Sequence, residues 1–217
     1  MCSPESYDLV MKNPHTIATY FAGRSLSIVL SPGRHDRGFR MIELLVTLSI
    51  AAILATIAVP NFFEFIRNSR MASQSNDLVL ALTYAKSEAV KRNLTVAVQK
   101  NADTVTACSS AGTGWSNGWT VFIDSDADGV VDVTEEVLQV WAALTGGNTL
   151  CFNNGSWVRY RNTGATASQG TFRICDTRGV TEARGVVVSA QGRVRRATDS
   201  NSDSIEEDGS GNNLTCP

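Results

Sequence analysis

An acidic segment in the middle of the 217-residue chain has the residue types and spacing of a calcium-binding loop. Residues 124–136 hold six acidic residues and no basic one. Oxygen-bearing side chains occupy positions 1, 3, 5, 9 and 12 of the calcium-loop pattern, and a glycine at position 6 allows the sharp turn. The five candidate ligands are Asp124, Asp126, Asp128, Asp132 and Glu135.

The segments on either side of this acidic stretch limit that interpretation. An EF-hand needs flanking helices, whereas the sequences WTVFI before the loop and EVLQV after it are strand-like. The alternative is an exposed acidic turn between two strands. Calcium is therefore the one cofactor that the sequence suggests, and both interpretations stay open.

A second candidate site is rich in arginine. Residues 157–196 hold eight arginines against two acidic residues and end in the run QGRVRR. The guanidinium group matches phosphate oxygens, and several such contacts give sequence-independent, salt-dependent binding of nucleic acid. In an extended strand, Arg193 and Arg195 lie on one face and Arg196 on the other. The candidate DNA-binding residues are Gly192, Arg193, Arg195, Arg196, Arg184 and Arg178.

Two features weigh against the DNA interpretation. The arginines could instead lie on an edge strand, where charge prevents sheets from associating edge to edge. The segment that follows, residues 197–217, has five acidic residues and no basic one, so it could fold over the arginines and compete with DNA.

Cysteine and histidine usage depends on whether the first 38 residues are retained. Without them the chain has no histidine and four cysteines. Loss of histidine removes Ser-His-Asp, Cys-His and His-metal chemistry, so we expect no enzymatic activity. Four cysteines suit two disulfides in an oxidising compartment and allow three connectivities. We favour the pairs Cys108–Cys151 and Cys175–Cys216.

Residues 41–60 are apolar apart from Glu43 and are long enough to cross a membrane as a helix. Arg34, Arg37 and Arg40 precede this stretch, which predicts a cytoplasmic amino-terminal side and export of the remainder. No small-residue cleavage site follows the stretch, so we expect it to be retained. A carboxylate within an apolar helix usually has a partner, so Glu43 either lies near the membrane interface and reaches the water there or is neutralised by an amine on a neighbouring helix.

The sequence from Gly38 to Val46, GFRMIELLV, followed by PNF at residues 60–62, resembles the class III signal of type IV pilins and type II secretion pseudopilins. The resemblance implies that a prepilin peptidase cuts after Gly38 and methylates the amine of Phe39. It also implies that Glu43 guides docking among pilins in the inner membrane. Arg40 replaces the usual small polar residue, and the leader is long for the family, so Met11 is an alternative start.

The elements around these sites predict an α+β fold, with one long helix packed on antiparallel sheet. Residues 61–93 carry an apolar stripe at helical spacing, made of Met71, Ser75, Leu78, Leu82, Ala85 and Ala89. From residue 94 the period changes to two, in the runs LTVAVQ, TVTAC, WTVFID, EVLQV, TFRIC and GVVVSA. The expected parts are a leader at 1–38, a transmembrane half-helix at 39–60, an amphipathic half-helix at 61–93 and a β-rich exported domain at 94–217.

The string ALTYAKSEAVKRNLTVAV, together with GWTVFID and GRVRR, resembles the GspH/FimT branch of the pilin-like proteins. This resemblance implies a minor pilin of a type IV pilus that binds double-stranded DNA through a GRxR motif for uptake in natural transformation. The alternative is a minor pseudopilin of a type II secretion system with no DNA role. In that case the arginines contact neighbouring subunits.

Overall fold

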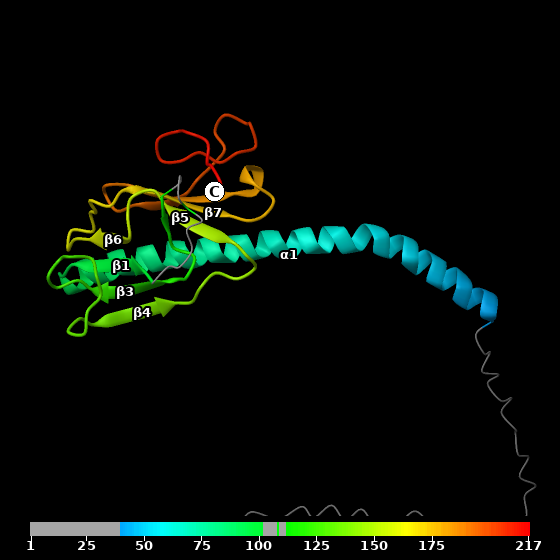
Figure 1. Cartoon of the computed structure of the whole chain (residues 1–217), viewed down its shortest axis with the longest axis horizontal. Helices are drawn as coiled ribbons and strands as arrows, with labels where there is room; N and C mark the ends of the chain where they lie inside the picture. Colours follow the sequence, from blue (N-terminus) through cyan, green and yellow to red (C-terminus); the bar gives the residue numbers. More distant parts are fainter. Residues whose placement is uncertain (1–39, 102–107, 109–111) are drawn as a thin grey trace, which may run out of the picture. The chain divides into compact units, whose positions relative to one another are not determined.

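A computed structural model describes residues 40–101, 108 and 112–217 of the chain (Figure 1). The chain divides into two units, 1–47 and 48–217, and the second contains both β-sheets. The first helix, α1, runs without interruption from Met41 to Arg92, through Pro60. It ends where Asn93 takes a positive φ of 58°, a left-handed conformation that commonly terminates helices.

The two halves of α1 differ in burial. Every residue from Met41 to Phe65 is exposed, although the sequence there is apolar. By length and composition, α1 is able to cross a membrane. The six residues of the predicted stripe, from Met71 to Ala89, are all buried.

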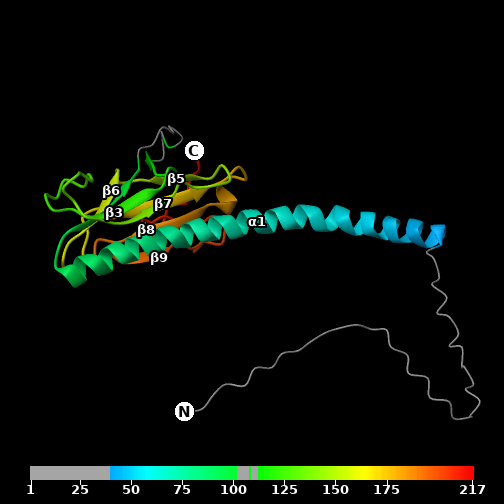
Figure 2. The same ribbon diagram turned by 90° about the horizontal axis from the view of Figure 1, so that it is seen from below.

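The β-strands form two antiparallel sheets that pack beside the second half of α1 (Figure 2). The first sheet, sheet A, has the order β4-β3-β1-β6, with β1 Val96–Lys100, β3 Trp119–Ile123, β4 Val137–Trp141 and β6 Trp157–Tyr160. The second, sheet B, has the order β2-β5-β7-β8-β9, with β2 Thr113–Gly114, β5 Thr149–Phe152, β7 Gly170–Cys175, β8 Arg184–Val188 and β9 Val194–Arg196. A short 3-10 helix, η1 Val180–Glu182, lies between β7 and β8.

One hydrophobic core joins the helix to both sheets. Leu78 and Leu82 of α1 lie in the same buried cluster as apolar residues of sheet A and of sheet B. At its centre the ring of Trp115 meets Phe172 edge-on at 4.9 Å, and Phe172 stacks on Phe152 at 4.0 Å. Burial of this shared apolar surface holds the α+β arrangement together.

The predicted α+β fold is confirmed, and five of the six predicted strand runs can be compared with the structure. Runs at 94–99, 119–124, 136–140, 171–175 and 185–190 coincide with β1, β3, β4, β7 and β8. The run at 104–108 lies outside the described residues, except for Cys108. Strands β2, β5 and β6 were not predicted, because each is only two to four residues long.

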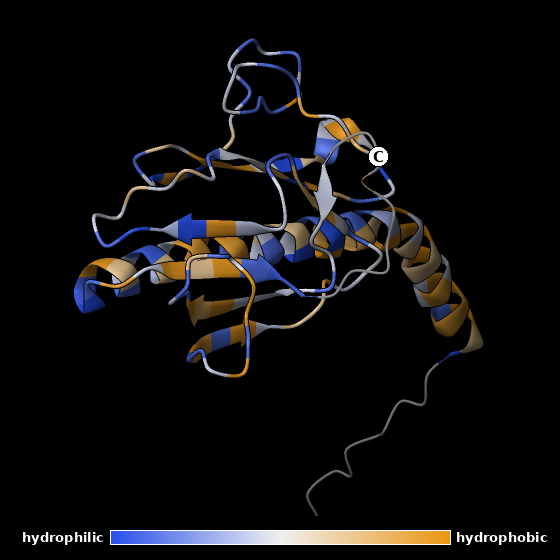
Figure 3. Ribbon diagram, turned by 60° about the vertical axis from the view of Figure 1, so that its left-hand side comes forward, coloured by the Kyte–Doolittle hydropathy of each residue, from blue (hydrophilic) through white to orange (hydrophobic). Residues whose placement is uncertain are grey.

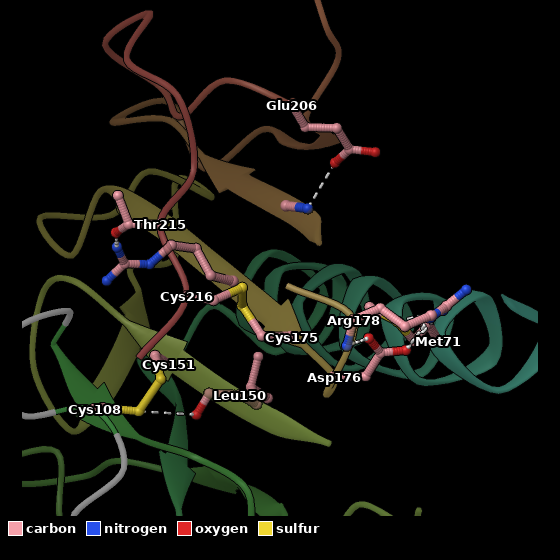
Figure 4. Close-up of a disulfide and its surroundings, with 12 residues drawn as sticks. Met71, Cys108, Leu150, Cys151, Cys175, Asp176, Arg178, Glu206, Thr215 and Cys216 are labelled. Atoms are coloured by element: carbon pink, nitrogen blue, oxygen red, sulfur yellow. Dashed lines mark hydrogen bonds and ion pairs between the residues drawn. A yellow bond between two sulfur atoms is a disulfide. The ribbon is translucent and has the colours of Figure 1, made fainter. Parts of the chain in front are cut away.

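Two disulfides connect sheet B to neighbouring segments (Figure 4). Cys108 is joined to Cys151 of β5, and Cys175 of β7 is joined to Cys216, with Cα–Cα distances of 5.8 and 5.9 Å. These are the pairs that we favoured from the sequence. The second disulfide holds the carboxyl-terminal segment, whose loops are largely hydrophilic (Figure 3), against the sheet.

Candidate functional site

The arginine run QGRVRR forms a tight turn and the last strand of sheet B. Strand β9 pairs with β8 on one side only, so it is an edge strand. The turn is closed by two backbone hydrogen bonds, from Ser189 N–H to Arg193 O at 3.0 Å and from Gly192 N–H to Ser189 O at 2.8 Å. Val194 packs against the hydrophobic core and anchors the strand.

Gly192 shapes this turn through its backbone. Its φ is +68°, which L side chains rarely adopt. A Cβ at this position would overlap the carbonyl oxygen of Gly164 and crowd the ring of Tyr160. The structure thus explains why glycine precedes the arginines: the turn approaches another backbone segment too closely for any side chain.

We call Arg193, Arg195 and Arg196 the arginine edge. All three are exposed, and none forms an ion pair with any residue that the structure describes. Arg195 Nη1 donates to the backbone oxygen of Arg196 at 3.3 Å, and Arg196 Nη2 donates to Asn76 Oδ1 on α1. The guanidinium groups of Arg195 and Arg196 therefore donate to neutral atoms, and the positive charge of all three arginines is not paired with a carboxylate of the described residues.

The register of β9 sets the directions of these side chains. Arg196 lies opposite Val186, which belongs to the core beneath α1, whereas Arg195 lies opposite Val187, which does not. Arg195 lines a cavity of about 480 Å³ on the side of sheet B away from the helix. The arginine edge thus presents positive charge on both faces of one strand.

The other two arginines in the predicted set lie in different surroundings. Arg184, at the start of β8, is partly exposed and pairs with Glu206 at 3.4 Å. The side chain of Arg178 is only 12% exposed and is held by Asp176, Glu64 and Glu182. The structure does not bring Arg178 to the arginine edge, and we correct the sequence-based grouping on this point: three carboxylates already use its guanidinium.

Lys86 of α1 was missed by the sequence analysis. Its Nζ donates to the backbone oxygen of Gln191 at 3.1 Å, which places an ammonium group beside the turn. Lys86 is more than one hundred residues from that turn in the sequence, so only the packing of α1 on sheet B reveals the proximity.

The acidic carboxyl-terminal segment does not neutralise the arginine edge. Its carboxylates mostly accept hydrogen bonds from backbone N–H groups of its own loops: Asp199 from Ser202 and Ser204, Asp203 from Ile205, Glu207 from Ser200 and Asn201, and Asp208 from Ser210 and Asn212. Glu206 is the one carboxylate of this segment that forms an ion pair with a described residue, Arg184. The competition that the sequence raised is therefore limited to Arg184.

Three of the five predicted metal ligands come together on the connection between β3 and β4. Asp124, Asp126 and Asp128 each place a carboxylate oxygen within 4.8 Å of the others. Asp124 is 1% exposed, and burial raises the pKa of its carboxyl group. The carboxylates of Asp132 and Glu135 lie outside this group and accept hydrogen bonds from the loop itself.

The predicted processing site lies at the edge of the described residues. Gly38 and Phe39 fall outside them, so the structure does not describe the proposed cleavage junction. Glu43 is exposed in the first turn of α1, where a carboxylate interacts favourably with the helix dipole.

Comparison with known proteins identifies the family. Residues 74–192 match the family described as type II transport protein GspH. A 52-residue stretch is 40% identical to type IV major pilin protein PilA of Myxococcus xanthus (strain DK1622), and it covers 24% of each chain. The chain therefore matches about a quarter of the length of that curated relative.

Two solved structures are similar to this one. The type IV minor pilin FimU of Pseudomonas aeruginosa (strain PAO1) is 21% identical, with a TM-score of 0.49, over 60% of this chain and 90% of that one. The minor pseudopilin EpsH from the type 2 secretion system of Vibrio cholerae is 14% identical, with a TM-score of 0.41, over 58% of this chain and 95% of that one. The match to the family over more than half of the chain shows that this protein belongs to the GspH family of type II transport proteins.

Proposed function

We propose that this protein is a minor pilin of a type IV pilus whose exported domain binds double-stranded DNA through the arginine edge. The observation that carries the proposal is the set of three exposed arginines on an edge strand, with no carboxylate paired to them among the described residues. An unpaired guanidinium is free to form bidentate contacts with phosphate.

The arrangement of these positive side chains suits contacts with the phosphate backbone of a duplex better than recognition of particular bases. Arg195 and Arg196 emerge from opposite faces of β9, and Lys86 adds charge beside the preceding turn. Phosphate contacts of this kind fix a duplex without reading its sequence. Such sequence-independent capture would suit uptake of DNA in natural transformation.

A second candidate function is a minor pseudopilin of a type II secretion system with no DNA role. Membership of a family described as type II transport proteins favours it. In that case the arginine edge pairs with carboxylates of a neighbouring subunit in the filament, and any affinity for DNA is incidental.

Electrophoretic mobility shift of a labelled duplex with the full-length protein in detergent tests these alternatives. We expect binding at low salt that weakens as salt rises, with a log–log slope that falls by about 2 in the Arg193→Ala/Arg195→Ala variant. The matched control is Lys91→Ala/Lys100→Ala, which removes the same charge elsewhere and should retain the slope.

Two outcomes would contradict the proposal. Unchanged binding by the arginine variant would mean that the arginine edge is not the binding surface. No binding by the unaltered protein at low salt would remove the DNA function and leave the secretion candidate.

We also propose the maturation pathway implied by the resemblance. A prepilin peptidase removes residues 1–38, and Phe39 becomes the methylated amino terminus. Residues 39–60 then span the inner membrane, residues 61–93 continue as the amphipathic half-helix, and residues 94–217 form the domain in the periplasm or on an extracellular pilus. The exposed apolar half of α1 supports the anchor. Glu43 then meets the new amine of a neighbouring pilin.

Mass spectrometry of membrane-extracted protein tests this pathway. Methylated Phe39 should be the first residue, and any other first residue would refute the pathway.

A further inference from the structure

We propose that the connection between β3 and β4 binds one calcium ion through Asp124, Asp126 and Asp128. One oxygen from each carboxylate lies within 4.8 Å of the others. Two oxygens bound to one calcium ion at 2.3–2.6 Å are no more than about 5 Å apart, so the three oxygens can share an ion. This inference is independent of the proposed DNA function.

The burial of Asp124 is the second observation that points to a cation. Its side chain is 0% exposed, and its Oδ2 accepts no hydrogen bond from any described residue. Nη1 of Arg159 forms an ion pair with this oxygen at 3.6 Å, beyond hydrogen-bond range, and neither atom has a hydrogen-bond partner among the described residues. A buried carboxylate is costly unless it is both paired and hydrogen-bonded, or coordinates a metal. The ion pair with Arg159 leaves Oδ2 of Asp124 without a hydrogen-bond donor, and a cation bound by Asp124, Asp126 and Asp128 would contact that oxygen directly.

The two exposed members of the group keep free ligand atoms. Asp126 and Asp128 each use Oδ1 to accept a backbone N–H, from Asp128 and Val130 respectively. No described residue donates to the second oxygen of either carboxylate. Each of the three aspartates therefore has one oxygen without a hydrogen-bond donor.

The remaining two predicted ligands, Asp132 and Glu135, form hydrogen bonds within the loop. Glu135 accepts hydrogen bonds from Ser125 N–H at 2.7 Å and Asp132 N–H at 3.4 Å, and Asp132 accepts from Thr134. Water and backbone oxygens would complete the coordination. With three carboxylates as direct ligands, we expect the dissociation constant of an extracellular module, about 0.1–1 mM.

A loop in the carboxyl-terminal segment provides an internal comparison. Asp199, Asn201 and Asp203 repeat the spacing of the three aspartates, and positive φ values occur at the equivalent fourth and sixth positions, Ser202 and Ser204. Here, however, both oxygens of Asp199 and of Asp203 already accept hydrogen bonds. The side-chain amide of Asn213 donates to the second oxygen of Asp203, so neither aspartate keeps an oxygen without a donor and we expect no ion at this loop.

Calcium and terbium, a luminescent calcium mimic, test the proposal on the full-length protein in detergent after chelator treatment. The ring of Trp157 packs against Gly129 of the loop, close enough to sensitise terbium emission. We expect one ion per chain by equilibrium dialysis with calcium, and terbium emission that calcium displaces.

Isosteric variants locate the ion. Asp126→Asn/Asp128→Asn should weaken calcium binding at least about tenfold, because it removes charged ligands at exposed positions without altering shape. The matched control Asp199→Asn should bind as the unaltered protein does. The proposal is overturned if calcium does not bind at millimolar concentration, if Asp126→Asn/Asp128→Asn binds normally, or if Asp199→Asn is the variant that loses the ion.

Discussion

Nη2 of Arg178 lies 2.7 Å from Oδ2 of Asp176, and both side chains are largely buried between η1 and α1. Arg178 Nη1 also donates to Asn68 on α1 at 2.8 Å. Figure 4 shows Arg178 and Asp176 beside Met71, close to the Cys175–Cys216 disulfide. This contact fastens the connection between β7 and β8 to the helix.

Arg178→Ala should destabilise the protein by about 2–4 kcal/mol, because the buried carboxylate of Asp176 would lose its partner. Thermal unfolding of the full-length protein in detergent, followed by near-ultraviolet circular dichroism, measures this loss. Lys91→Ala is the control: it removes an exposed ion pair with Glu88 and should cost no more than about 0.5 kcal/mol. Equal effects of the two variants would contradict the assignment.

Acid should weaken the same contact. Burial alone would raise the pKa of Asp176, but the hydrogen bonds and charge of Arg178 outweigh burial and hold the pKa below its usual value. The contribution of Asp176 is therefore present above its unfolded pKa of about 3.9 and is lost as the pH falls from there through the folded pKa. The stability difference from Asp176→Asn should shrink below about pH 4. A difference that stays constant from pH 6 to pH 3 would argue against the ion pair.

Two leucines on α1 provide a matched pair of variants that tests the packing of the helix on the sheets. Leu78 is 0% exposed and Leu80 is 60% exposed. Leu78→Ala should cost about 2–5 kcal/mol through lost burial and a residual cavity, whereas Leu80→Ala should stay within about 0.5 kcal/mol. Chemical denaturation of the two variants compares them directly. Similar costs would mean that the stripe does not face the sheets.

Tyr160→Phe should leave stability unchanged or raise it by up to about 1 kcal/mol. The hydroxyl of Tyr160 is buried, and no described residue forms a hydrogen bond with it. Burial also raises the pKa of the phenol. Removing an unsatisfied buried polar group relieves its desolvation cost. Tyr160→Ala should instead lose about 3–5 kcal/mol, and a large loss for Tyr160→Phe would reveal a hydrogen bond to the hydroxyl.

Removing the Cys175–Cys216 disulfide as a pair of alanines should cost about 3–4 kcal/mol, since the bond closes a loop of 41 residues. Reduction of the unaltered protein with a thiol should cost more, because it also breaks the Cys108–Cys151 disulfide. Limited proteolysis should then cut the carboxyl-terminal segment first. Resistance of that segment in the alanine variant would show that its other contacts suffice.

The elements predicted correctly were the long helical stripe and the strands of five or six residues. The stripe from Met71 to Ala89 spans five helical turns, so its buried face could be identified from spacing alone. Short strands such as β5 and β6 have too few residues to show a period of two.

The details of the arginine site depended on contacts between distant parts of the chain. Lys86 donates to the backbone oxygen of Gln191, and Arg178 forms an ion pair with Glu64 on α1. In each pair the two residues are more than one hundred positions apart in the sequence. Spacing along the sequence contains no information about either contact. The sequence singled out Gly192 of the GRxR run. Only the structure shows why a glycine is needed there: the backbone of Gly164 lies too close for a side chain.

Both covalent cross-links attach to strands of sheet B, at Cys151 and Cys175, whereas sheet A has none among the described residues. Chemical reduction should therefore affect the two sheets unequally. Amide hydrogens of β5 and β7 should exchange with deuterium sooner in the reduced protein, while those of β1 and β3 keep their protection. The domain would then open from one side, with its helix still seated on the other sheet.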